Sequence, residues 1–174
     1  LDLPPRISEA YALMFIDTTL PTNLPAPNED DPVVCILDSG VLAGHPYLAT
    51  WVVDGVDFES GEGTPVDLNG HGTAVAGILA YGDVSSCIRD ATWEPTVKIC
   101  SAKVLKNDPI TGRAVFPEEL RVERMTEEAI RYFAAERNCR VYNLSIGNAG
   151  DVYQGQRQFP WAEKLDELSR ELDI

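Results

Sequence analysis

VDLNGHGTAVAGILAYG, residues 66–82, is the stretch that decides how the rest of the chain is interpreted. His71 stands between Gly70 and Gly72, which free the backbone on both sides of it to approach another segment closely. A histidine that only fills a core has no need of two flanking glycines. Both a structural and a reactive role therefore remain open for His71, and its neighbours have to decide between them.

The segment after His71 predicts a helix that begins at this histidine. Val75, Ile78 and Leu79 fall at i, i+3 and i+4, the spacing of a helix face turned toward a core. The same segment holds small residues that would let the helix lie close to a neighbouring element, namely Ala74, Ala76 and Gly77. The sequence therefore places His71 at the N-terminus of a closely packed helix.

Length and charge describe about one acidic domain. The chain has 174 residues, of which 28 are acidic and 14 basic, so its net charge is −14. This charge argues against binding to nucleic acid and to an anionic membrane surface. No transmembrane run and no signal peptide is visible. Because the chain begins at Leu1 rather than Met, we expect it to be a piece of a longer protein.

The cysteines form neither a zinc motif nor a disulfide framework. No CxxC pair exists, and two of the four lie inside apolar, strand-like runs: Cys35, Cys87, Cys100 and Cys139 are the complete set. Buried free thiols in a reducing compartment are the simplest account, with a single disulfide as the alternative. We therefore expect a cytoplasmic protein, with secretion as the alternative.

The amino-acid composition of the chain changes after residue 32. Residues 1–32 are rich in proline and end in an acidic run, so we interpret them as an extension or linker. Within them, the run at 8–16 fits either a helical turn or a strand. Beyond them, buried strands are predicted at 33–38, 51–58, 96–105 and 140–147, and helices from His71, at 117–138 with Pro117 near the first turn, and at 160–172. This alternation predicts an α/β fold with a parallel sheet flanked by helices.

Ligands of such sheets bind at the carboxyl ends of the strands, where Asp38 and His71 are both expected. Asp38 ends the first predicted strand, although Asp-Ser-Gly is also a common turn sequence. A buried carboxylate that faces an imidazole N–H fixes the tautomer of the ring and stabilises its charged form. Together the two residues are candidates for two members of a nucleophilic triad.

The other acidic and histidine candidates are assigned structural roles. His45 follows Asp38 too closely to face it across the end of the sheet, and it precedes a proline. Three further acids, Asp54, Asp57 and Asp67, are expected in loops, either solvated or capping turns.

Three blocks of the sequence resemble conserved blocks of the subtilisin-like serine peptidases, the subtilases. These blocks are VVCILDSGV, NGHGTAVAGILA and VYNLSIG, and their order agrees with the family order of Asp, His and then Ser. The resemblance covers residues 33 to about 172. It implies a subtilisin-like fold that is incomplete, with residues 33–174 as the amino-terminal part of the peptidase domain.

The resemblance also implies roles for individual residues. Asp38 would orient His71, and His71 would act as the general base. Two groups match the walls of the substrate cleft: Ser145, Ile146 and Gly147 on one side, and Gly112, Arg113 and Ala114 on the other. A polypeptide substrate would bind there by strand addition, with backbone hydrogen bonds giving affinity.

The sequence departs from the family pattern at the nucleophile. The only serine after Ser145 is Ser169, which falls on a polar helix face and cannot serve. The oxyanion asparagine belongs after a strand that would follow Ile174, and Asn148 has the wrong context. We therefore expect this chain alone to be inactive, with the missing groups on the remainder of the catalytic domain.

Calcium and partner proteins are the remaining implications of the resemblance. Tyr47 stands where an acidic calcium ligand is common, and residues 81–95 replace an Asn-rich calcium loop, so no cofactor is expected. Residues 70–84 also resemble a bacterial, apparently intracellular branch in which some members are encoded beside an ATPase partner. A bare sheet edge beside residues 141–146 would favour homo-oligomers.

Two functions stay open at this point. The first is a serine endopeptidase, and the second is a non-catalytic module that binds a peptide or a partner through its sheet edge. The presence of both Asp38 and His71 favours the enzyme. A nucleotide-binding domain is disfavoured, because the glycines of DSGVLAG are too far apart to cradle a phosphate.

Overall fold

Four parallel strands form the central sheet of the protein. The computed structural model describes residues 24–61, 63–147, 155 and 158–174. The strands lie in the order β2-β3-β1-β6, with β1 at Val33–Asp38, β2 at Val52–Asp57, β3 at Lys98–Lys103 and β6 at Val141–Asn143. The predicted run at 8–16 lies outside the described residues, and residues 24–32 contain neither a helix nor a strand.

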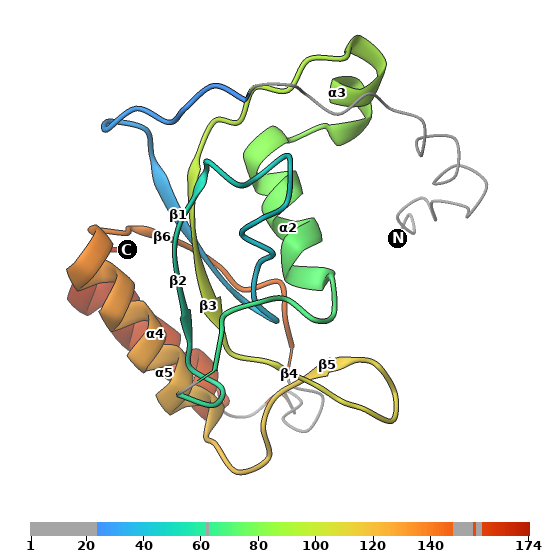
Figure 1. Ribbon diagram of the computed structural model, residues 1–174. Coiled ribbons are helices and arrows are strands. Elements are labelled where there is room, and N and C mark those ends of the chain that lie inside the picture. The colour runs from blue at the N-terminus through green and yellow to red at the C-terminus, as the bar shows by residue number, and fades with distance from the viewer. Residues whose placement is uncertain (1–23, 62, 148–154, 156–157) are drawn as a thin grey trace.

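Helices cover both faces of this sheet, as Figure 1 shows. Helix α2, His71–Tyr81, packs on one face, and α4, Val122–Arg137, with α5, Pro160–Leu172, packs on the other. The parallel sheet flanked by helices confirms the predicted α/β class. The first strand is buried between the layers because its apolar residues point to both faces.

Helix α2 approaches the sheet through its small residues. Gly72, Ala76 and Ala80 are buried at i, i+4 and i+8. A Cβ atom added at Gly72 would lie only 2.1 Å from the carbonyl oxygen of Gly40. The first turn of α2 is therefore in direct backbone contact with the turn after β1.

The predicted apolar face of α2 is wrong at Ile78. This side chain is 60% exposed, whereas Val75 and Leu79 are partly buried against the core. The close approach of the small-residue face leaves Ile78 on the side of the helix away from the sheet.

Two further elements differ from the sequence prediction. Residues 84–90 form the short helix α3, Val84–Asp90, whose backbone N–H groups at Ser85 and Ser86 donate to the side chain of Asp83. A helix of this length shows no clear apolar period, so the sequence missed it. Pro117 is not in the first turn of α4, because that helix begins only at Val122.

The cysteines lie mostly in the core and none is paired. Cys35, Cys100 and Cys139 are buried, Cys87 is half-buried, and all four are free thiols. The free thiols are confirmed, and the alternative of a single disulfide is wrong. Burial raises the pKa of Cys35 and raises that of Cys100 to about 12.

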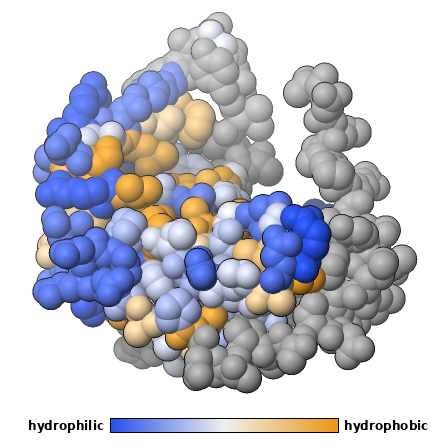
Figure 2. All heavy atoms as spheres, turned by 90° about the horizontal axis from the view of Figure 1, so that it is seen from above, coloured by the Kyte–Doolittle hydropathy of each residue, from blue (hydrophilic) through white to orange (hydrophobic). Residues whose placement is uncertain are grey.

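Hydrophobic residues also reach the surface. Figure 2 shows them as patches among hydrophilic residues on one face of the molecule. Val141, on the edge strand β6, is 56% exposed, so that edge of the sheet is open among the described residues. None of the helices in the described ranges is long and apolar enough to cross a membrane.

Candidate active site

Asp38 is the last residue of the central strand β1 and is fully buried. Its strand is hydrogen-bonded on both sides, to β3 and to β6, so its carboxyl end lies in the middle of the sheet edge. The backbone N–H of Ser39 donates to Asp38 Oδ1 over 2.7 Å. The carboxylate is thus held in place by its own turn before it meets any other side chain.

His71, the first residue of α2, faces this carboxylate. Its Nδ1 atom lies 2.9 Å from Oδ1 and 2.9 Å from Oδ2 of Asp38. These distances fall within the usual hydrogen-bonding range of about 2.6–3.2 Å. A carboxylate accepts hydrogen bonds, so this contact favours the tautomer with the proton on Nδ1, which leaves Nε2 as an acceptor. The His71 side chain is 48% exposed, which gives Nε2 access to the surface.

Gly70 provides the sharp entry into α2. It precedes the helix in a left-handed conformation, with φ at 92°, which favours glycine. Gly72 allows the close contact with Gly40 described above. Gly70 thus allows the turn before α2, and Gly72 allows the close approach of α2 to the end of β1.

Asp67 joins the β1 turn to the start of α2. Its Oδ1 accepts from Ser39 Oγ at 2.9 Å, Asn69 N at 2.9 Å and Gly70 N at 2.8 Å. Its Oδ2 accepts from the backbone N–H and the hydroxyl of Thr73, at 2.9 and 2.6 Å. Asp67 therefore caps the turn, which was one of the two roles expected from the sequence. The other role, a solvated acid, is wrong because Asp67 is buried.

The hydrogen bonds of Asp67 outweigh the cost of its burial. Burial alone would raise the pKa of this carboxyl, but the bonds from Thr73, Gly70 and Asn69 lower the pKa below its ordinary value. The hydroxyl of Ser39 completes the link, because it donates to Asp67 and accepts from Gly72 N at 3.2 Å. Sequence reasoning missed this network, although the spacing of Asp67 and Thr73 around a glycine turn is a signal for it.

The expectation that Asp54 and Asp57 lie in loops is wrong, because Asp54 lies within strand β2 and Asp57 ends it, and both form ion pairs. Asp57 is buried and lies 3.5 Å from Lys103 Nζ, which is a correction to the solvated alternative. Asp54 lies 2.8 Å from Arg137 Nε. His45 accepts from the backbone of Tyr47 at 3.4 Å, which agrees with a structural role for this histidine.

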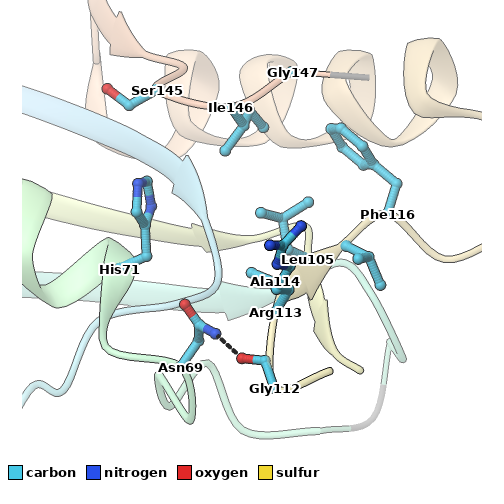
Figure 3. Close-up of a pocket in the computed structure, with 11 residues that line it drawn as sticks. Asn69, His71, Leu105, Gly112, Arg113, Ala114, Phe116, Ser145, Ile146 and Gly147 are labelled. Carbon is cyan, nitrogen blue, oxygen red and sulfur yellow. Dashed lines mark hydrogen bonds between the residues drawn. The ribbon is translucent and has the colours of Figure 1, made fainter. Parts of the chain in front are cut away.

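A cavity of about 350 Å³ opens beside His71. Figure 3 shows His71 at one end and Phe116 at the other, with the two predicted groups on facing walls. The residues that line it are Asn69, His71, Leu105, residues 112–116 and residues 145–147. The structure thus brings together the cleft residues that the sequence placed there, and their role in binding stays a prediction.

Each wall of the cavity differs in detail from the sequence prediction. The expected strand at 140–147 is shorter, so residues 145–147 follow β6 without being paired in it. The opposite wall is a hairpin of β4, Lys106–Asn107, and β5, Ala114–Val115, which the sequence missed because both strands are very short. Asn69 Nδ2 donates to Gly112 O over 2.7 Å and ties this hairpin to the histidine loop.

The described residues show no group of three or more His, Cys, Asp and Glu side chains that could hold a metal ion. Tyr47, at the position of the expected acid, packs its ring 4.2 Å from that of Trp93.

A parallel α/β sheet that presents a buried aspartate and then a histidine at its carboxyl edge agrees with a subtilisin-like fold. A cold-adapted subtilisin-like serine proteinase of known crystal structure has this fold, with a TM-score of 0.52 and 22% identity. The match covers 90% of this chain and 48% of the other. The model of the subtilase family matches residues 29–172, and the chain belongs to this family.

Curated relatives agree with this assignment. Thermitase from Thermoactinomyces vulgaris is 34% identical over 114 residues, 66% of this chain and 37% of thermitase. The thermophilic serine proteinase of Bacillus sp. (strain AK1) is 32% identical over 114 residues, 66% of this chain and 25% of that protein. The major intracellular serine protease of Bacillus subtilis (strain 168) is 29% identical over 123 residues, 68% of this chain and 35% of that protein. The chain thus spans well under half the length of these relatives.

Proposed function

We propose that the chain forms the general-base half of the catalytic site of a subtilisin-like serine endopeptidase. The observation that carries the proposal is the pair of 2.9 Å contacts between His71 Nδ1 and the buried carboxylate of Asp38. Membership of the subtilase family supports a serine peptidase. Asp38 and His71 lie in the chain order of that family.

The geometry supports a defined proton path. With Nδ1–H directed at Asp38, Nε2 of His71 takes the proton of a serine hydroxyl as that oxygen attacks the carbonyl carbon of the substrate. Asp38 stabilises the imidazolium that forms, and His71 then returns the proton to the leaving amine. Ionised and buried, Asp38 acts by orientation and charge and does not itself take the proton.

The nucleophile is proposed to come from outside the described residues. Ser39 Oγ is engaged with Asp67 and Gly72, and Ser145 Oγ donates to Asn143 Oδ1 over 2.9 Å. Ser169 Oγ donates to the carbonyl of Ile174. None of these three hydroxyls is hydrogen-bonded to His71, so we expect the chain alone to be inactive.

Substrate is proposed to bind as an extended strand between the two walls of the cavity. Residues 145–147 lie at the open edge of the sheet, where their backbone groups are not paired in a strand. The hairpin residues Gly112 and Ala114 supply the facing wall. Self-association through the open edge, an ATPase partner and a cytoplasmic location stay predictions.

The test uses the full-length protein with a serine-directed phosphonate probe and an unfolded protein substrate. The unchanged protein should label and cleave, and His71→Ala should abolish cleavage and most of the labelling. His45→Ala is the matched control, because it removes the other histidine of the chain and should leave both unchanged. A full-length protein that neither labels nor cleaves would favour the non-catalytic binding module instead.

A further inference from the structure

We propose that the cleft beside His71 selects peptides that carry an acidic side chain and that Arg113 makes this selection. The inference rests on the proposed function, since it names the substrate class of the same cleft. Arg113 belongs to the hairpin wall of the cavity. In Figure 3 its guanidinium points from the Gly112 side into the cavity, toward the wall that carries Ile146.

The backbone that carries Arg113 is held on both sides. Its carbonyl accepts from Asp108 N at 2.8 Å, and its N–H donates to Thr111 Oγ1 at 3.3 Å. The preceding residue, Gly112, accepts the hydrogen bond from Asn69 that ties the hairpin to the histidine loop. The position of the Arg113 backbone relative to His71 is therefore set by the fold of the hairpin.

The charge of Arg113 is not used within the described part of the protein. Its guanidinium makes no hydrogen bond or ion pair to any other described residue, whereas Arg131 pairs with Glu127 and Glu171. In a chain with 28 acidic and 14 basic residues, most cations find an acid close by. Arginine also keeps its charge at every pH at which the protein is folded. An unpaired arginine is thus available to a ligand.

The cavity has the opposite sign to the molecule as a whole. The chain carries a net charge of −14, but none of the described residues that line the cavity is acidic. The carboxylate of Asp38 lies behind His71 and is hydrogen-bonded to it. That of Asp108 is engaged within its own turn, where it accepts from Ile110 N and Thr111 Oγ1. Among the described residues, an Asp or Glu side chain of a bound peptide would therefore meet a cation and no competing acid.

The expected preference is modest because Arg113 is exposed. A pair between an exposed arginine and a carboxylate is worth little in water, and we expect about a 1.5–5-fold preference for Glu over Gln. The net charge of the molecule repels acidic peptides at long range and lowers their association rate. The preference is therefore measured as a difference between variants at one fixed ionic strength.

The test compares blocked peptides that are identical except at one position, which holds Glu, Gln or Lys. Further sets of peptides place this variable residue at each other position in turn. Their kcat/KM values are measured with the full-length protein. At one position kcat/KM for the Glu peptide should exceed that for the Gln peptide by about 1.5–5-fold. Arg113→Gln should make kcat/KM equal for the Glu and Gln peptides, and Arg113→Glu should give a preference for the Lys peptide. Arg121→Gln is the matched control, because Arg121 is also exposed but lies outside the cavity.

The outcomes separate the inference from the proposed function. Cleavage of the Gln peptide tests the proposed function by itself. Equal cleavage of Glu and Gln peptides at every position would overturn the inference and leave the proposed function standing. A Glu preference that survives Arg113→Gln would also overturn it. Absence of cleavage of every peptide would contradict the proposed function, and the inference with it.

Discussion

Two glycines of helix α2 should respond in opposite ways to the same substitution. Gly72 faces the β1 turn, and an added Cβ would lie 2.1 Å from Gly40 O and 3.2 Å from Asp38 Cβ. Gly77, five residues further along the helix, has no atom within 4 Å of the added Cβ. Gly72→Ala and Gly77→Ala therefore form a matched pair in one helix.

The size of each effect follows from these distances. A carbon and a carbonyl oxygen approach to about 3.3 Å, so Gly72→Ala requires a movement of about 1 Å. Gly40 cannot give way easily, because an added Cβ there would itself lie 2.4 Å from Pro65 O. Overpacking of this kind costs about 1–3 kcal/mol. At Gly77 the alanine meets open space and should stabilise the helix by about 0.5–1 kcal/mol.

Urea unfolding of both variants checks this prediction. The midpoint urea concentrations are compared with the same m-value, the dependence of the unfolding free energy on urea concentration, for both variants. In the full-length protein, a displacement of about 1 Å at His71 should also lower kcat/KM by about 10²-fold for Gly72→Ala, while Gly77→Ala keeps its activity. A Gly72→Ala variant as stable as Gly77→Ala would refute the backbone contact between α2 and the β1 turn.

Three further predictions concern an acid, the thiols and calcium. Asp67→Asn should lower the free energy of unfolding by about 1–3 kcal/mol at pH 7. Because the folded-state pKa of Asp67 is lowered, this contribution is present above the unfolded pKa of about 3.9 and is lost as the pH falls through the folded pKa. Unfolding curves from pH 7 to pH 3 test this. A constant difference in unfolding free energy between the unchanged protein and Asp67→Asn over that range would contradict it. A thiol reagent at pH 8 should modify only Cys87 in the folded protein, as measured by mass spectrometry. Labelling of the buried cysteines, Cys35, Cys100 and Cys139, would contradict this prediction. Thermal melts with calcium and with a chelator should coincide, and a higher midpoint with calcium would show that the loop after α2 was misinterpreted.

The sequence predicted those parts of the fold whose residue pattern has one physical cause. Strand β1 is buried on both faces, so its pattern is a continuous apolar run that ends at Asp38. Helix α5 begins at Pro160 and ends at Leu172, as its apolar spacing indicated. In both cases local preference and tertiary packing favour the same structure.

The prediction was wrong or incomplete where packing overrides the local pattern. Ile78 has the spacing of a core residue, but the glycine and alanine face of α2 packs closer to the sheet than a branched side chain allows. The burial of Asp67 depends on donors from Ser39 and Thr73, which only the folded chain brings together. Single-residue properties favour a solvated loop acid there, and the partners decide otherwise.

The hydrogen bonds that set the aspartate–histidine pair join residues close to one another in two short segments. Asp38 and Ser39 come from the end of β1 and its turn, Asp67 comes from the loop before α2, and His71 and Thr73 come from the first turn of α2. No contact in this set reaches α4, α5 or the cleft walls. The base and its orienting acid are therefore assembled by the β1 turn and the first turn of α2. Within the proposed function, a separately supplied serine would meet a histidine whose tautomer is already fixed, so catalysis depends on where that serine is placed.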